Sequence, residues 1–274
     1  MTRKIIYISI FAILMQVSSA NAGSTGNEKI SSSNNDNIKE CFEGFSRTMF
    51  KFNNALDSAV FEPVAKGYRA LPVGLRKGTG NVVDNLRSLL TLSNNILQGD
   101  FRQAGTTAGR FGINTTLGIL GIFDPAAKLG LVGKRKEDFG QTMGVWGSKS
   151  GCYFVLPILG PTTARDAVGL VGNVFLDPVY QITHNKEIAN GVVGNGSYSE
   201  HNYYYYRSAG SVDFRAKNIE SFNTLEETSI DLYSSVKSLY LQNRNKQIKN
   251  SQSSTDTQDD GAWEEFDVIV IETN

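Results

Sequence analysis

Residues 45–60, FSRTMFKFNNALDSAV, decide the fold class of this chain. Apolar residues recur in this stretch at spacings of three and four, at Phe45, Met49, Phe52, Leu56 and Ala59 or Val60. This period places the apolar side chains on one face of an α-helix and the polar ones on the other. The stretch therefore predicts an amphipathic helix.

Helical periodicity continues outward from this stretch. Pro63 opens a short predicted helix, because proline is favoured in a first helical turn. Residues 82–97 predict a long helix that ends at Gly99, a residue that readily adopts the left-handed conformation of a helix cap. Residues 101–116 predict a further helix, whose small residues let another backbone or a lipid tail approach closely, with close packing as the favoured reason: Gly105, Ala108, Gly109 and Gly112. The fold class predicted is all-α.

The beginning of the chain differs from this helical body. Arg3 and Lys4 precede an apolar run at residues 5–17, and small residues follow up to Ala22, which predicts a secretory signal peptide over residues 1–22. We therefore expect an exported protein. No cysteine follows Ala22 directly, so we expect no lipid anchor.

The remaining segments divide into a body and two low-complexity flanks. Residues 220–243 predict a last amphipathic helix that docks against the body. Residues 23–41 predict a flexible leader, because they hold too few apolar side chains to offset the entropy of ordering. Residues 246–274 predict a low-complexity tail, in which 267–271 is the only strongly strand-like stretch. The helical body is expected over residues 42–245.

Charge and cysteine content exclude some partners. The chain carries 27 basic and 27 acidic side chains, and loss of the signal peptide would leave 25 basic ones and a net charge of about −2. No polybasic face points to a nucleic-acid partner. Cys41 and Cys152 are the only cysteines, and in an oxidising compartment they either form a disulfide or stay as buried thiols. We expect no metal site and no cofactor.

Residues 117–132, LGILGIFDPAAKLGLV, form two short apolar arms. Asp124 and Pro125 between them are typical of a turn or a helix start. Each arm spans about 10 Å even as a helix, whereas the hydrocarbon core of a bilayer is about 30 Å thick. We therefore expect an apolar hairpin that can enter one leaflet but cannot cross both. A hairpin buried in the protein core is the alternative that the pattern leaves open.

Residues 151–169, GCYFVLPILGPTTARDAVG, are apolar but too irregular for one helix. Pro157, Gly160 and Pro161 interrupt the pattern, and Arg165 with Asp166 opens the next helical stretch. The segment predicts an apolar loop packed against the body.

The residue combinations of common enzymes are missing. His184 and His201 do not lie at metal-ligand spacing with the cysteines, and no nucleophile elbow, phosphate-binding loop or zinc-protease motif occurs. The SSVK stretch from Ser234 to Lys237 matches a hydrolase motif only weakly and is more typical of a solvated helix face. We expect no enzymatic activity.

A series of motifs, in matching order, resembles the MlaA/VacJ family of outer-membrane phospholipid-transport proteins. EGFSR at residues 43–47 is similar to the family's amino-terminal motif. Further matches are LQGD at 97–100, RF at 110–111, NTTLG at 114–118, FDPA at 123–126, DFGQT at 138–142, LP at 156–157, GP at 160–161 and RD at 165–166. The resemblance covers about residues 42–244.

The resemblance implies a fold, a location and partners. It implies a single ring-like domain of helices at the periplasmic face of the outer membrane, in contact with the inner leaflet. Its function would be to remove mislocalised phospholipid from the outer leaflet through a central amphipathic channel and so to maintain lipid asymmetry. Its implied partners are phospholipid, a trimeric porin, a periplasmic lipid-shuttle protein and an inner-membrane transporter.

Candidate site residues follow from this reading. The apolar walls of a lipid path are expected at Phe45, Met49, Phe52, Leu56, Leu117, Ile119, Leu120, Ile122 and Phe123. Arg47 and Arg165 are candidates for contact with the headgroup phosphate, with structural ion pairing as an equal alternative.

The chain departs from the family pattern at its cysteines. Family members are commonly lipoproteins, and the acylated cysteine is absent here. Cys41 and Cys152 stand where the family usually has proline, which suggests a disulfide that replaces the rigidity of proline. Such a bond would contribute about 2–4 kcal/mol of stability, and a Cα separation well beyond about 7 Å would exclude it.

Two other functions remain open at this point. An exported membrane-active or host-interaction factor would permeabilise vesicles without moving lipid in one direction. A hydrolase would break down lipid in a reaction that Ser234→Ala abolishes.

Overall fold

The computed structural model describes residues 38–131, 135–192, 199 and 201–252. The described residues belong to one compact unit, and they are helical apart from one two-stranded sheet. The all-α class is confirmed. The predicted signal peptide, most of the predicted leader and the strand-like stretch at 267–271 lie outside the described residues. Within them, no helix combines the length and the hydropathy that crossing a bilayer requires.

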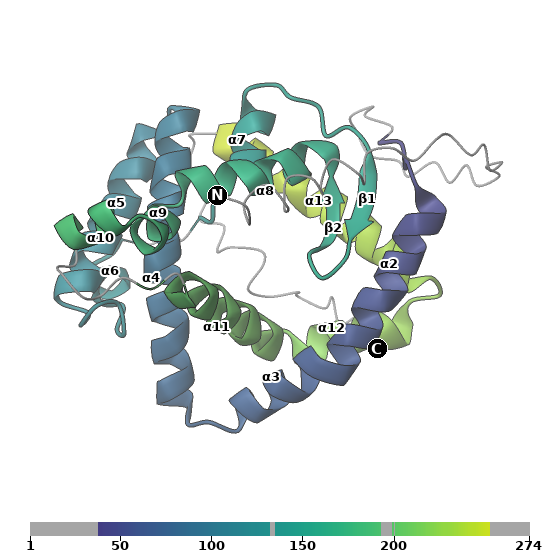
Figure 1. Cartoon of the computed structure of the whole chain (residues 1–274), viewed down its shortest axis with the longest axis horizontal. Helices are drawn as coiled ribbons and strands as arrows, with labels where there is room; N and C mark the ends of the chain where they lie inside the picture. Colours follow the sequence, from purple (N-terminus) through teal and green to yellow (C-terminus); the bar gives the residue numbers. More distant parts are fainter. Residues whose placement is uncertain (1–37, 132–134, 193–198, 200, 253–274) are drawn as a thin grey trace, which may run out of the picture. The chain divides into compact units, whose positions relative to one another are not determined.

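The first three helical elements follow one another without a turn. They are α2 (Glu43–Leu56), the π-helix η1 (Asp57–Phe61) and α3 (Glu62–Arg69), which lie end to end in Figure 1. Pro63 lies in the first turn of α3, as predicted. The π-helix carries the backbone hydrogen bonds across the junction, so the proline starts a new α-helical segment without a loop before it.

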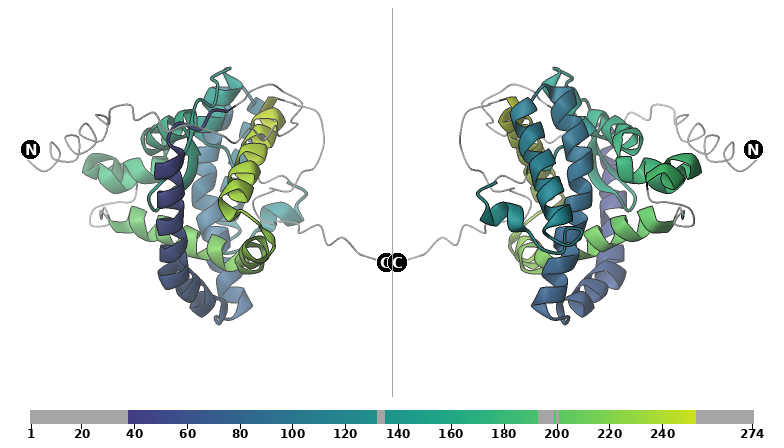
Figure 2. Two further views of the ribbon diagram at one scale, coloured as in Figure 1. Left: turned by 90° about the vertical axis from the view of Figure 1, so that its right-hand side faces the viewer. Right: turned by 90° about the vertical axis from the view of Figure 1, so that its left-hand side faces the viewer.

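A pair of long helices comes next. These are α4 (Val73–Gln98) and α5 (Phe101–Thr116), which run side by side (Figure 2). As predicted, Gly99 caps α4 in the left-handed conformation, with φ 77°. Asp100 then caps α5 by accepting a hydrogen bond from the Gln103 backbone N–H.

Two of the small residues of α5 do not serve the close packing that was favoured, whereas Gly109 is half-buried beside Leu131. Cβ atoms built on Gly105 and Gly112 would meet no atom within 4 Å, so these residues face open space. The buried residues of α5 are Ala104, Arg110 and Asn114 instead. Close packing at Gly105 and Gly112 is therefore wrong, and the polar residues Arg110 and Asn114, which gave no apolar signal, hydrogen-bond inward instead.

Residues 151–169 form regular structure and not a loop. Strand β1 (Tyr153–Leu156) pairs antiparallel with β2 (Gly160–Thr163), and α8 (Ala164–Leu176) follows at once. Pro161 is tolerated at this edge of a two-stranded sheet because proline only removes one donor from the ladder. Pro157 and Gly160, which suggested a loop, mark the hairpin turn.

The last predicted helix is two helices. These are α12 (Ile219–Thr228) and α13 (Leu232–Gln252), which continues past the predicted body boundary at residue 245. Asp231 separates them because its carboxylate accepts hydrogen bonds from the Tyr233 and Ser234 backbone N–H groups and so caps the new helix. Apolar residues recur at helical spacing on both sides of Asp231, so the sequence pattern did not reveal the break between the two helices.

The remaining helices are short apart from α11. They are α6 (Pro125–Lys128), α7 (Phe139–Val145), α9 (Pro178–His184), α10 (Lys186–Val192) and α11 (His201–Lys217).

Packing between elements closes into a circuit. Helix α2 packs on β2, β2 on α13, α13 on α7, and α7 on α4. Helix α4 then packs on α11, α11 on α3, and α3 on η1, which leads back to α2. Such a closed order of contacts is what a ring-like helical domain requires.

The interior of the described part is unusually polar. Buried polar and charged side chains outnumber buried apolar ones there. The apolar contacts form two small clusters, one of Ala65, Ala216 and Ile219 and one of Tyr153, Val155 and Tyr233. Hydrogen bonds and ion pairs must therefore hold much of the fold together.

The start of the described chain is fixed to the β1–β2 hairpin. Cys41 and Cys152 form a disulfide with their Cα atoms 5.5 Å apart, within the limit set by the disulfide hypothesis. Glu40 bridges to Tyr153 in the parallel sense, and its carboxylate accepts hydrogen bonds from Tyr233 and Lys237 of α13. Residues 38–41, assigned to the leader from sequence, are therefore part of the fold.

Candidate functional site

The turn between α5 and α6, residues 117–123, exposes most of its apolar side chains. Leu117, Ile119, Leu120, Ile122 and Phe123 are between 42% and 72% exposed. These are the five hairpin residues that the sequence proposed as lipid contacts. The two buried residues of the turn are glycines. The buried core hairpin, the alternative left open by the sequence, is therefore not what the structure shows.

Hydrogen bonds hold this turn in a defined shape. The Gly121 N–H donates to the Asn114 carbonyl over 2.9 Å, and the Phe123 N–H donates to the Gly118 carbonyl over 2.9 Å. The Asn81 side chain of α4 donates to the Ile122 carbonyl over 3.0 Å. The apolar side chains thus project from a fixed backbone.

Two residues of the turn adopt a strained backbone conformation. Ile119 has φ 52° and Leu120 has φ 56°, in the left-handed region that costs non-glycine residues about 1–2 kcal/mol each. Such conformations persist where the surroundings dictate them, and they cluster at functional sites. The strain is retained here at two of the most exposed apolar positions of the turn.

Glycines make the turn fit against the helices. Gly121 has φ 89°, and a Cβ there would lie 2.7 Å from the Cβ of Asn85 on α4. A Cβ on Gly118 would lie 2.4 Å from the Asn114 carbonyl oxygen. A larger residue would clash at both positions, because the nearest atoms belong to backbone or to the base of a side chain.

Asp124 connects the turn to α5. Its carboxylate accepts hydrogen bonds from Arg110 over 2.7 Å, from Asn114 over 2.9 Å and from the Ala127 N–H over 3.2 Å, so it caps α6 with Pro125 in the first turn. The helix start predicted at Asp124 and Pro125 is confirmed. The ion pair with Arg110 is largely buried.

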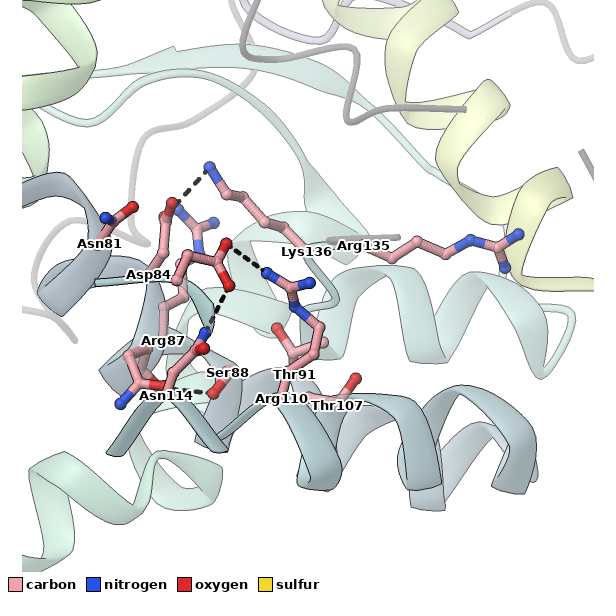
Figure 3. Close-up of a pocket in the computed structure, with 12 residues that line it drawn as sticks. Asn81, Asp84, Arg87, Ser88, Thr91, Thr107, Arg110, Asn114, Arg135 and Lys136 are labelled. Carbon is pink, nitrogen blue, oxygen red and sulfur yellow. Dashed lines mark hydrogen bonds and ion pairs between the residues drawn. The ribbon is translucent and has the colours of Figure 1, made fainter. Parts of the chain in front are cut away.

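A polar pocket lies between α4, α5 and the segment after α6 (Figure 3). It encloses about 540 Å³, counting the solvent at its mouth. Its charged lining consists of Asp84, Arg87, Arg110, Asp124, Arg135 and Lys136, a net charge of +2. Lys136 approaches Asp84 to 3.5 Å, as Figure 3 shows. Asn81 and Asn85 line the pocket and also contact the apolar turn at Ile122 and Gly121.

The apolar stripe of α2 is divided between surface and core. Phe45 and Phe52 are 52% and 48% exposed, whereas Met49 packs on the cluster around Tyr153 and Val155. Leu56 is half-buried. Figure 1 places α2 and the turn before α6 at opposite edges of the view, so the two proposed sets of lipid contacts are separate surfaces.

The face of α2 that meets the β1–β2 hairpin is partly polar. Ser46 is fully buried, and its Oγ accepts a hydrogen bond from the Val155 N–H over 3.3 Å. Asn53 donates to the Leu156 carbonyl and accepts from the Ile158 N–H. These polar contacts turn Phe45 and Phe52 outward, which the apolar period alone did not predict.

Both headgroup candidates lie in ion pairs. Arg47 pairs with Glu43 and Asp231, and its guanidinium lies 4.4 Å from the centre of the Tyr233 ring. Arg165 is 6% exposed and donates through Nε and Nη2 to Asp166 over 3.0 Å. Structural ion pairing, the alternative given for these residues, describes both.

A charged network joins α7, α8 and α13. Arg244 donates to Asp138 over 2.6 Å and to Asp166 over 2.8 Å, and the Tyr240 hydroxyl donates to Asp166 over 2.6 Å. Burial by itself would raise the pKa of Asp138, but the Arg244 guanidinium and the hydrogen bonds from Gln141 lower it to about 2. Burial also opposes ionisation of Asp166, but Arg244 and Tyr240 lower its pKa below the ordinary value, so both carboxylates are ionised in the folded protein at neutral pH.

The groups considered for enzymatic chemistry have structural partners. The Ser234 hydroxyl donates to Asp231 over 2.7 Å, and Lys237 pairs with Glu40. His184 stacks on Tyr180, with ring centres 3.9 Å apart. Within the part of the chain that the structure describes, no group of three His, Cys, Asp or Glu side chains could hold a metal ion.

Reasoning from sequence did not select the pocket residues. Arg87, Arg135 and Lys136 look like ordinary surface charges in the sequence, because they come from segments far apart in the chain. Arg110 and Asp124 belong to motifs that carry the family resemblance, and this was the available signal. Their pairing over 2.7 Å could not be derived from spacing.

The fold and the site define a class of protein: a helical domain with a polar interior, a fixed and exposed apolar turn, and a cationic pocket beside it. The family model described as MlaA lipoprotein matches residues 38–247. The chain therefore belongs to the MlaA lipoprotein family.

Several relatives and a solved structure match the chain. It is 30% identical to the intermembrane phospholipid transport system lipoprotein MlaA of Haemophilus influenzae, over 85% of this chain and 86% of that protein. The protein of the same name from Escherichia coli is 31% identical over 73% and 74% of the two chains. An uncharacterized protein of Rickettsia prowazekii is 40% identical, but the match spans only 54% of this chain and 59% of that protein. A solved chain from a study of how bacteria maintain outer membrane lipid asymmetry has a TM-score of 0.63 and 28% identity, over 77% of this chain and 99% of that one.

Proposed function

We propose that this protein transports phospholipid between the outer and inner membranes and removes mislocalised phospholipid from the outer leaflet of the outer membrane. Its family supports this, because relatives in Haemophilus influenzae and Escherichia coli are named as intermembrane phospholipid transport lipoproteins. The observation that carries the proposal is the turn at 117–123, whose backbone is fixed while its apolar side chains stay exposed.

The physical basis is the amphiphilic nature of a phospholipid. Acyl chains need apolar walls, and a charged headgroup needs polar partners along the same route. The turn offers the first through Leu120 and Phe123, and the adjoining pocket offers the second. Phe45 and Phe52 on α2 provide a separate exposed apolar surface. No bond is made or broken in this mechanism.

Location and partners belong to the same proposal. The protein acts at the periplasmic face of the outer membrane, with a trimeric porin and a periplasmic lipid-shuttle protein, as the family resemblance implies. Named relatives are lipoproteins. In this chain both cysteines are used in the Cys41–Cys152 disulfide, which supports attachment through the apolar turn and not through an acylated thiol. Intact-mass measurement of the membrane-extracted protein tests this, and a diacylglyceryl mass would refute it.

Genetic complementation tests the function. A strain that lacks the gene should accumulate phospholipid in the outer leaflet, measured by its accessibility to an outer-leaflet lipid-modifying enzyme, and the wild-type gene should reverse this. We expect Leu120→Gln combined with Phe123→Gln to fail in rescue. Leu75→Gln combined with Ile230→Gln removes two exposed apolar side chains elsewhere and should rescue fully.

The outcomes separate the function from the site. If the wild-type gene does not change outer-leaflet phospholipid, the proposed function is refuted. If the turn variant rescues as well as the control variant, the function stands and the turn is not its lipid contact.

A further inference from the structure

Arg87 is a cation of the pocket without a counter-charge. It lines the pocket from α4 and is half-buried. Among the residues that the structure describes, it has no hydrogen-bond or ion-pair partner. The positive charge of Arg87 acts on Tyr206. Burial and the charge of Asp177 raise the pKa of Tyr206 to about 12, and the charge of Arg87 lowers it. A half-buried guanidinium that lacks a carboxylate is suited to bind an anion.

The other charges at the centre of the pocket are engaged. Arg110 is held by Asp124 over 2.7 Å, and Lys136 lies 3.5 Å from Asp84 (Figure 3). These pairs consume both acidic side chains of the lining, so they leave no carboxylate to neutralise Arg87. An incoming anion would meet Arg87 without displacing an existing ion pair.

Hydroxyl groups supply further donors at the same place. Thr91 follows Arg87 by one helical turn, so both side chains lie on one face of α4. The Thr91 Oγ accepts a hydrogen bond from the Glu137 N–H, and the Thr107 Oγ accepts one from Asn95. A hydroxyl that accepts through its oxygen keeps its own hydrogen for another acceptor. A phosphate has the several oxygens that such a set of donors can satisfy.

The rim of the pocket is continuous with the exposed apolar turn. Asn81 lines the pocket and also donates to the Ile122 carbonyl over 3.0 Å. Asn85 lines the pocket and lies directly against Gly121. An anion bound at Arg87 therefore has the exposed apolar turn on the neighbouring segment, and this favours an amphiphile over a small inorganic anion.

We infer that this pocket binds the phosphate group of a phospholipid, with Arg87 as its principal cation and the acyl chains on the turn at 117–123. The inference rests on the proposed function and makes it specific. It places headgroup recognition at Arg87, away from Arg47 and Arg165, which are already paired within the fold.

Calorimetric titration of the purified full chain tests the inference. The probes are dihexanoylphosphatidylglycerol below its micelle concentration, dihexanoylglycerol as the same amphiphile without phosphate, and inorganic phosphate. We expect Arg87→Gln to weaken binding of the short-chain phospholipid at least about tenfold, since it removes a charge-assisted contact. Arg87→Lys should keep part of the affinity. Arg76→Gln is the matched control, because Arg76 is half-buried on the same helix but outside the pocket, and it should bind within twofold of wild type.

Each outcome decides a separate question. Urea unfolding first establishes that every variant is folded. If Arg87→Gln is not folded, the phospholipid affinity of Arg87→Lys is compared with that of wild type instead. Equal phospholipid affinity of wild type and the Arg87 variants would overturn the inference and leave the proposed function intact. Inorganic phosphate that binds as tightly as the phospholipid would overturn the lipid assignment. Absence of phospholipid binding by the wild type would count against the proposed function itself.

Discussion

Arg244 is the residue that joins the two carboxylates of the charged network between α7, α8 and α13. It contacts Asp138 and Asp166, which lie 106 and 78 residues earlier in the chain, and it is 8% exposed. Its removal would leave the half-buried Asp138 without its cation and the buried Asp166 with Arg165 alone. Breaking a buried ion pair from one side usually costs about 3–5 kcal/mol.

We therefore predict that Arg244→Met lowers the free energy of unfolding by about 3–5 kcal/mol, measured by urea denaturation. Arg69→Met is the control, because it removes an arginine from the exposed pair with Glu220. The control should cost less than about 1 kcal/mol. A loss of similar size in both variants would show that the network does not carry the stability assigned to it.

The same network predicts an acid dependence of stability. The pKa of Asp138 is about 2 in the folded protein, against 3.8 for the free side chain, so the unfolded state binds protons first as the pH falls. Its contribution is complete above about pH 4 and is lost as the pH falls to about 2, a change of about 2 kcal/mol. We expect urea titrations across this range to show the loss in wild type. In Arg244→Met the loss should be much smaller, and an unchanged profile would contradict this origin.

At the scale of elements, the turn at 117–123 is a rigid unit whose fit depends on Gly121. Alanine there must adopt φ near 89° and place its Cβ 2.7 Å from the Asn85 Cβ. Gly147→Ala is a matched control, since Gly147 has φ 91° and open space around it. We predict a cost of about 1 kcal/mol for Gly147→Ala from backbone strain alone, and about 1–3 kcal/mol more for Gly121→Ala from the clash. Equal losses of stability in the two variants, measured by thermal unfolding, would mean that the turn shifts to accept the added Cβ and is not rigid.

The elements could be predicted from sequence where an apolar period or a cap marks them. Helix α5 has the predicted bounds, and α4 ends at Gly99 as expected. The β1–β2 hairpin was missed because Pro157 and Gly160 are residue types that usually mark loops. The strand pairing itself depends on contact with α2, which a local pattern does not reveal. The break at Asp231 was missed because a capping carboxylate inside an apolar period looks like one more solvated charge.

The candidate site could be predicted only in its apolar half. Exposed apolar residues in the turn have a continuous local pattern, and the family resemblance assigns it a role. The pocket has no such pattern, because Arg87 becomes distinctive only once Arg110 and Lys136 are seen to be paired with Asp124 and Asp84. Charge balance in three dimensions is not a property of any short segment.

At the scale of the whole molecule, the Cys41–Cys152 disulfide closes a loop of 111 residues. Cross-links over loops of this length typically stabilise a domain by about 2–4 kcal/mol, mainly by restricting the unfolded chain. We predict that Cys41→Ser combined with Cys152→Ser lowers the free energy of unfolding by that amount. Reduced wild type should match the double variant. Equal stability of the oxidised and reduced wild type would exclude this role.

Glu40 has a consequence for the time course of folding. Its partners Tyr233 and Lys237 lie 193 and 197 residues away along the chain. Contacts at such separation form late, because the entropy of closing the intervening loop must be offset before they can add stability. The contacts of Glu40 with α13 thus wait for the last described helix, whereas residues 38–41 can pair with β1 once that strand has been synthesised.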